Sequence, residues 1–202
     1  VIFCVLLFFG TILASKLSDT YQLIMAFYAL SSFLYTKFLK QIPIVDIFTL
    51  SFFYLLRLIS GGVLMEVSVS NWLLTFSVFF FLFLASAKRW IELKRTDFGY
   101  ISGRGYQSTD VSFIRQLSYF SGLISVLIIC LYLDSEQAQI LFGLSGLMWF
   151  VPAIILYWTL EILFKIERGE VDDDIVIYAL KSKSSYISLI GFLVIFSLSL
   201  PG

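Results

Sequence analysis

The chain alternates long apolar runs with short polar connections. A membrane-spanning helix needs about 20 mostly apolar residues, because the hydrocarbon core of a bilayer is about 30 Å thick. Runs of this kind predict seven spanning helices, of which the first is cut short. In chain order they cover roughly 1–15, 21–36, 44–64, 72–88, 113–133, 140–164 and 185–200. The pattern predicts an all-α integral membrane protein, a multi-helix transmembrane bundle.

The composition supports this prediction. Of 202 residues, 59% are hydrophobic and 14% are charged, whereas soluble domains contain about 25% charged residues. The chain opens at Val1 inside an apolar run, without the basic region that begins a signal peptide. We therefore expect residues 1–202 to form a single transmembrane domain that is a fragment of a longer protein.

The charges of the connections predict an orientation. Lys and Arg gather in the connections 37–43, 88–112 and 165–184, and are absent from those near 65–71 and 134–139. By the positive-inside rule, the three basic connections face the cytoplasm. Two of the three are long, and long loops usually have a task. We expect a protein of the plasma membrane with a cytoplasmic active face.

Two features narrow the possible chemistry. The chain contains no His, which excludes His-dependent triads, a His general base and the usual zinc-hydrolase motifs. Arg57 lies well inside the third predicted span, where a charged side chain is almost always paired or faces a polar cavity. It is either a structural ion pair or a buried guanidinium for an anionic ligand, and we favour the second.

The stretch "FLFLASAKRWIELKR", residues 81–95, ends a span in a cluster of charges. Lys88, Glu92 and Arg95 fall on one face of a continuing helix, and Arg89 lies beside them. Such a cluster is either a membrane anchor, with long side chains reaching the interface, or the mouth of an active site.

The sequence after this stretch favours a site. A Gly-rich segment, "DFGYISGRGYQSTD", can fold over a ligand with Arg104 and Tyr106 at its tip. The next helix begins with Arg115 and Tyr119 one turn apart. Two charged helix ends joined by a flexible segment predict a pocket for a phosphorylated ligand.

The second long connection contains three adjacent acidic residues, Asp172, Asp173 and Asp174. They are either a solvated helix start, or they bind hydrated magnesium or orient the nearby basic residues. The sequence leaves both interpretations open.

Several stretches resemble one family. They are "LLRLISGGVLMEVSVSNWLL", "FLFLASAKRWIEL" and "RQLSYFSG", followed by "ERGEVDDDIVIYAL". Over about residues 20–190 they resemble the decaprenyl-phosphate phosphoribosyltransferase branch of the UbiA-type membrane prenyltransferases. The Lys-Arg-x-x-Glu element is the most specific part. The chain departs from that branch at Ile175, where Pro is expected, and at Lys181-Ser182-Lys183, where an Asp-Arg ending is expected.

The resemblance implies a bundle of nine helices around a cavity that opens to the cytoplasm, with about seven spans present here. The missing part would be two helices and the first Asp-rich loop, which carries the principal magnesium ligands of the family. We therefore expect the isolated chain to be inactive, and the function below to belong to the longer protein.

The reaction implied is transfer of a 5-phosphoribosyl group from phosphoribosyl pyrophosphate to a polyprenyl (decaprenyl) phosphate, with release of pyrophosphate and Mg²⁺ as cofactor. It requires binding of two anionic substrates and stabilisation of the leaving group. The expected catalytic residues are Lys88, Arg89 and Glu92, with Glu92 also a candidate metal ligand. The residues expected to bind substrate phosphates are Arg57, Arg115, Tyr119 and Arg104.

Two alternatives remain open. A UbiA-type enzyme that transfers a prenyl group to an aromatic or other small acceptor usually carries a second Asp-rich motif on the 88–112 connection, where Asp97 is the nearest Asp. A non-catalytic transporter would show broken helices and paired repeats. The expected partners are the two substrates and the membrane, with a homo-oligomer possible and no nucleic acid.

Overall fold

A computed structural model of the protein describes residues 18–95, 103–142, 146–171 and 174–199. In this part of the chain the regular elements are all helical. The long helices are α2 (Asp19–Lys37), α3 (Val45–Leu64), α4 (Asn71–Lys94), α5 (Val111–Leu133), α7 (Phe150–Arg168) and α9 (Lys183–Ser199). The short ones are η1 (Leu39–Gln41), η2 (Ser108–Asp110), α6 (Glu136–Phe142), η3 (Gly146–Trp149) and α8 (Ile175–Lys181).

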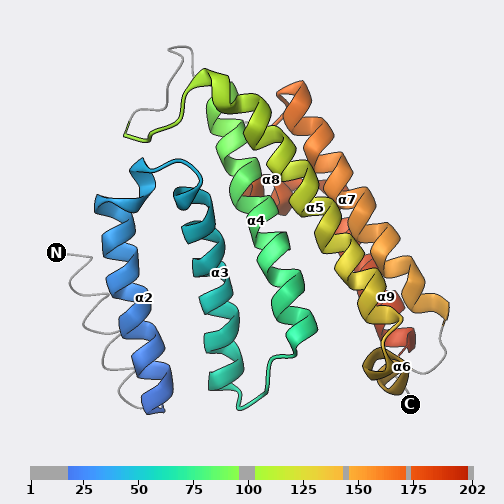
Figure 1. Ribbon diagram of the computed structural model, residues 1–202. Helices are drawn as coiled ribbons and strands as arrows, with labels where there is room; N and C mark the ends of the chain where they lie inside the picture. The colour runs from blue at the N-terminus through green and yellow to red at the C-terminus, as the bar shows by residue number, and fades with distance from the viewer. Residues whose placement is uncertain (1–17, 96–102, 143–145, 172–173, 200–202) are drawn as a thin grey trace.

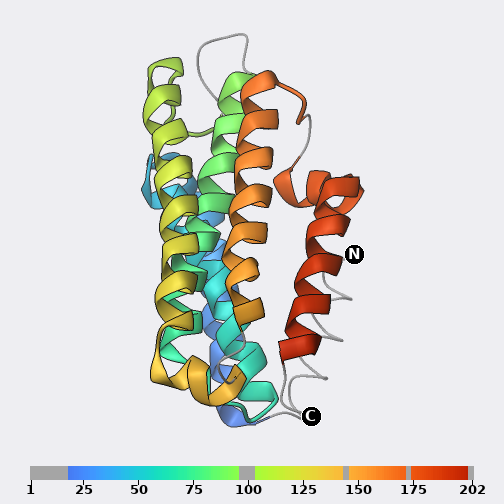
Figure 2. The ribbon, with the colours of Figure 1, turned by 90° about the vertical axis from the view of Figure 1, so that its right-hand side faces the viewer.

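The long helices form a row in which sequential neighbours pack together (Figure 1). The closest pair is α4 and α5, joined in the core by a hydrogen bond from Ser118 Oγ to Ser86 Oγ of 3.0 Å. Gly122 lets α7 approach α5, because a Cβ at this position would lie 2.8 Å from Thr159 Cγ2. Viewed after a quarter turn, α9 lies apart from α4 and α5, on the far side of α7 (Figure 2).

The predicted fold class, an all-α membrane bundle, is confirmed. Four helical stretches are long and apolar enough to cross a membrane: Val45–Leu64, Asn71–Lys94, Ser108–Leu133 and Gly146–Arg168. A fifth span results if α8 and α9, which meet at a bend of 78°, are counted as one broken helix.

The predicted count of seven spans is not confirmed. The expected span 1–15 lies outside the described residues. The expected span 21–36 is a helix, α2, but it is not among the stretches apolar enough to cross a membrane. The expected span 140–164 corresponds to the apolar stretch Gly146–Arg168, which η3 and α7 form together. Residues 140–142 belong to α6, and residues 143–145 lie outside the described residues.

The basic connections meet at one end of the bundle, which we call the charged end (Figure 1). It contains η1, the last turn of α4, the start of α5, the last turn of α7, and α8. The turn between α3 and α4, and helix α6, lie at the opposite end. Successive connections lie at alternate ends of the bundle, as predicted. Which end faces the cytoplasm stays a prediction.

Candidate functional site

A buried carboxylate organises the charged end. Asp46 lies in the first turn of α3 and is fully buried. It accepts a hydrogen bond from Tyr35 Oη at 2.7 Å and one from Arg104 Nη1 at 2.9 Å. It also pairs with Arg89 on α4, whose Nη2 lies 3.3 Å from Asp46 Oδ1 and whose Nε donates to Asp46 Oδ2. Asp46 therefore joins α2, α3, α4 and the segment before α5.

Glu92 extends this cluster toward the surface. Its carboxylate pairs with Arg89 Nη1, one turn earlier on α4, and lies 3.5 Å from Arg104 Nε. Arg89 is fully buried, whereas the Arg104 side chain is 21% exposed. Two guanidinium groups thus face two carboxylates, and the four charges sum to zero. Such compensation is needed because an unpaired buried charge is very costly.

The segment that carries Arg104 docks on the turn before α3. Gly105 packs so closely that a Cβ would lie 2.3 Å from Gln41 O. Tyr106 is buried, and its hydroxyl accepts a hydrogen bond of 2.9 Å from Ile44 N–H. Burial raises the pKa of Tyr106 to about 12, so it is protonated at neutral pH. The contact holds Ile44 at a φ of 68°, which β-branched residues rarely adopt.

Lys88 makes the connection between α4 and α8. Its Nζ pairs with Asp174, whose Oδ1 also accepts a hydrogen bond of 2.9 Å from Val176 N–H and caps α8. Partial burial raises the pKa of Asp174, but the hydrogen bonds from Lys88 and Val176 outweigh it, so the pKa lies below its usual value. The other two acidic residues of this run, Asp172 and Asp173, lie outside the described residues.

Arg115 and Tyr119 lie on α5, near the same end. Arg115 Nη1 is 3.3 Å from Glu167 Oε1, and both side chains are largely exposed. Tyr119 packs its ring against Trp90, with the ring centroids 6.0 Å apart. The structure therefore gives Arg115 access to solvent, while the ring of Tyr119 is part of the interface between α4 and α5.

Arg57 is placed elsewhere. It is exposed rather than buried, which corrects the expectation of a buried guanidinium. Because it follows Asp46 by 11 residues on α3, it lies about 16 Å further along the helix axis. It is therefore not part of the charged end, where Lys88, Arg89, Glu92, Arg104 and Arg115 gather.

The part of the chain that the structure describes contains no candidate metal centre. Among the described residues, no three Asp, Glu, His or Cys side chains come together in a way that could hold a metal ion. Glu92, the candidate ligand, is instead engaged by Arg89 and Arg104.

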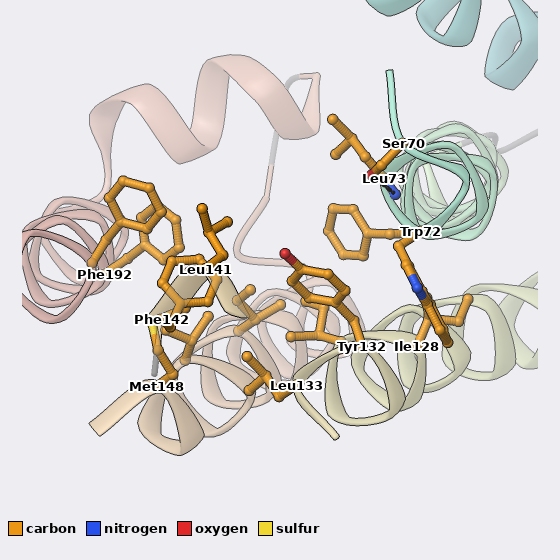
Figure 3. A pocket seen from close by; sticks show the side chains of 15 residues that line it. Ser70, Trp72, Leu73, Ile128, Tyr132, Leu133, Leu141, Phe142, Met148 and Phe192 are labelled. Carbon is orange, nitrogen blue, oxygen red and sulfur yellow. Dashed lines mark hydrogen bonds between the residues drawn. The ribbon is translucent and has the colours of Figure 1, made fainter. Parts of the chain in front are cut away.

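An apolar groove runs between α4, α5, α7 and α9. Its larger part, of about 410 Å³, lies toward the end opposite the charged end (Figure 3). A second part, of about 250 Å³, shares Phe76, Ile155 and Phe192 with it and reaches Trp158 and Ser185. Trp158 Nε1 donates to Ser185 Oγ at 3.0 Å, so polar groups begin where the groove approaches the charged end.

Two residues of the charged end, Asp46 and Tyr35, were not predicted, and the sequence contains only weak signals for them. Asp46 is a lone acidic residue at the start of a predicted span, and Tyr35 lies near the end of the preceding one. Their meeting depends on how the helices pack, which no spacing in the chain reveals. Asp174 was singled out, but not as the partner of Lys88.

Together, the fold and the charged end define a helical bundle of the membrane-spanning class, with an ion network at one end that is buried at Asp46 and Arg89 and reaches the surface at Glu92 and Arg104. No family model matches the chain. The chain is 30% identical over 154 residues to decaprenyl-phosphate phosphoribosyltransferase of Mycobacterium tuberculosis, which covers 74% of this chain and 48% of that protein.

Two further relatives have other names. The chain is 30% identical over 177 residues to an uncharacterized protein, y4nM, of Sinorhizobium fredii, covering 86% of this chain and 34% of that protein. It is 28% identical over 193 residues to the nodulation protein NoeC of Azorhizobium caulinodans, covering 93% and 62%. The chain thus spans between about a third and three fifths of the length of these three relatives, and the expected N-terminal truncation stays a prediction.

Proposed function

We propose that this chain belongs to a UbiA-type membrane transferase that moves a 5-phosphoribosyl group from phosphoribosyl pyrophosphate to a polyprenyl phosphate. The observation that carries the proposal is the gathering of Lys88, Arg89, Glu92, Arg104 and Arg115 at one end of an apolar helical bundle. The name of the mycobacterial relative supports the choice of reaction.

The reaction suits this set of side chains. The bond between the anomeric carbon of ribose and a pyrophosphate oxygen breaks, and an oxygen of the lipid phosphate forms the new bond to that carbon. Pyrophosphate leaves with the electron pair, through an oxocarbenium-like state as in other glycosyl transfers. The acceptor is already an anion, so the reaction needs no general base, and cations do the work of binding and charge stabilisation.

The exposure of the cations separates their proposed roles. Lys88 is 36% exposed and Arg115 is 42% exposed, so both can exchange a carboxylate partner for a substrate phosphate. Arg104 can also exchange its carboxylate partners for a substrate phosphate, although its side chain is only 21% exposed. Arg89 has no exposed surface, and we assign it a positioning role, in which it holds Glu92 and Asp46 in place.

Magnesium remains a proposal for the longer protein and rests on the family resemblance alone. The described residues do not fit a magnesium centre, and no step of the reaction is assigned to the ion here. We assign Glu92 to the ion network, and not to a metal.

The apolar groove fits the other end of the proposed acceptor. Its lining of aromatic and aliphatic side chains can bury an isoprenoid chain, because apolar contact needs no directional partner. We propose that the polyprenyl tail lies in this groove with its phosphate toward the charged end.

One rival function has an observation in its favour. The 78° bend between α8 and α9 is the kind of broken span that transporters use at a binding site. A transporter would bind its substrate without producing a phosphoribosyl lipid, so product formation separates the two proposals.

Lys88→Ala in the full-length protein tests the proposed site. We expect the KM for phosphoribosyl pyrophosphate to rise about tenfold, the scale of a lost charge-assisted hydrogen bond. Lys37→Ala, at an exposed position on α2 near the same end, is the matched control and should leave the KM unchanged. Altered membrane insertion with normal kinetics would instead make Lys88 an anchor.

A further inference from the structure

Arg57 has an unusual environment for a charge inside a span. It lies in the stretch Val45–Leu64, which is apolar enough to cross a membrane, and its side chain is exposed there. Its Nη2 donates a hydrogen bond of 2.8 Å to Tyr28 Oη on the neighbouring helix α2 (Figure 1). The guanidinium carbon also lies 5.6 Å from the ring centre of Tyr28 and 5.8 Å from that of Tyr54.

These neighbours hold the guanidinium in place but do not neutralise it. No Asp or Glu of the described residues forms an ion pair with Arg57. The sequence of residues 1–17 contains no acidic residue either. A cation at this depth is costly unless it is paired, and aromatic rings offset only part of the cost.

The surface beside the guanidinium is open. Gly61 lies one helical turn beyond Arg57, on the same face of α3, and a Cβ there would meet no atom within 4 Å. Tyr28 Oη accepts from Arg57, which leaves the hydroxyl proton available for donation to a ligand. An anion at this open surface would receive hydrogen bonds from both the guanidinium and the phenol.

We propose that Arg57, Tyr28 and the open surface at Gly61 form a second site, which binds the phosphate group of a membrane lipid. The ligand is a lipid because Arg57 lies inside a stretch that is long and apolar enough to cross a membrane. Apolar side chains exposed nearby on α2 and α3, such as Phe27 and Phe52, would contact its hydrocarbon part. Because the site is about 16 Å along α3 from Asp46, its lipid is not the one that reacts.

The test measures lipid binding to the full-length protein by native mass spectrometry, without any assay of transfer. Phosphatidylglycerol is the lipid titrated, because polyprenyl phosphate would also occupy the proposed acceptor site. We expect Arg57→Ala to weaken binding at least about tenfold. Tyr28→Phe and Gly61→Leu, which keep the charge but remove a donor or cover the open surface, should each weaken it about threefold.

Arg168→Ala is the matched control, because Arg168 is an exposed arginine at the charged end. It should leave lipid binding unchanged. The proposal is overturned if Arg57→Ala, or both Tyr28→Phe and Gly61→Leu, bind lipid like the wild type, or if Arg168→Ala weakens binding as much as Arg57→Ala. Equal competition by inorganic phosphate would also overturn it, because the site would then take a free ion. Since transfer is not measured, these outcomes leave the proposed reaction untouched.

Discussion

Asp46 holds two arginines and a tyrosine although no part of its side chain reaches solvent. At the scale of single residues, the charged end is a set of mutually dependent partners rather than a row of independent cations. The sequence predicted the cations Lys88, Arg89 and Arg104, because basic residues at a span end stand out from an apolar chain. It did not predict which carboxylates they meet, since that follows from helix packing.

Asp46→Ala should strongly destabilise the protein. The change leaves Arg89 buried without its main partner, and breaking a buried ion pair on one side costs about 3–5 kcal/mol. The loss is measured as the change in the free energy of unfolding in detergent. Glu167→Ala breaks only two partly exposed pairs, with Arg115 and with Lys94, and should cost about 1 kcal/mol or less. Equal losses in the two variants would contradict the central role of Asp46.

The pair between Lys88 and Asp174 should depend on pH. The pKa of folded Asp174 lies below its unfolded value of about 3.9, so the pair stabilises the fold above that pH. The stabilisation is lost as the pH falls through the folded pKa. We expect the melting temperatures of the wild type and Asp174→Asn to differ at pH 5–7 and to converge below about pH 4. A difference that does not change with pH would argue against the pair.

At the scale of elements, hydrophobic length predicted most of the helices but not all of their bounds. Apolar runs placed α3, α4 and α5 well, because a spanning helix satisfies its own backbone. The span expected at 140–164 was placed a few residues too early, since the stretch that can cross a membrane is Gly146–Arg168. Of the segment 97–110, which is expected to fold over a ligand, residues 103–107 dock on the turn before α3, while residues 97–102 lie outside the described residues. Its folding over a ligand stays a prediction.

Gly105→Ala tests that docking. The added methyl group would lie 2.3 Å from Gln41 O, so the segment must shift away from the turn. We expect faster amide hydrogen exchange in residues 103–107 and a lower melting temperature. Gly146→Ala, at a position where a Cβ meets no atom within 4 Å, is the control and should change neither. Unchanged exchange in Gly105→Ala would show that the close contact does not hold the segment.

At the scale of the whole molecule, the alternating charge of the connections predicted which of them share an end of the bundle. That prediction succeeded because each spanning helix carries the chain to the opposite side of the membrane. The chemistry of the charged end was less predictable, because the carboxylate that organises it, Asp46, meets its partners only through helix packing. The sequence therefore predicts the class of fold better than the composition of the site.

Orientation in the membrane can be measured directly. In a variant without Cys4 and Cys130, we introduce Lys40→Cys at the charged end or Glu136→Cys at the other end. The positive-inside rule predicts that an impermeant maleimide labels position 136 on intact cells and position 40 only after the cells are opened. The reverse pattern would place the charged end outside, away from a cytosolic phosphoribosyl donor.

The most direct test of the proposed function is transfer itself. The full-length protein in detergent receives magnesium, polyprenyl phosphate and phosphoribosyl pyrophosphate labelled in the ribose, and the label in the organic phase is counted. The account predicts lipid-borne label that depends on polyprenyl phosphate. Absence of labelled lipid, together with transfer from a labelled prenyl pyrophosphate to an aromatic acceptor, would contradict it.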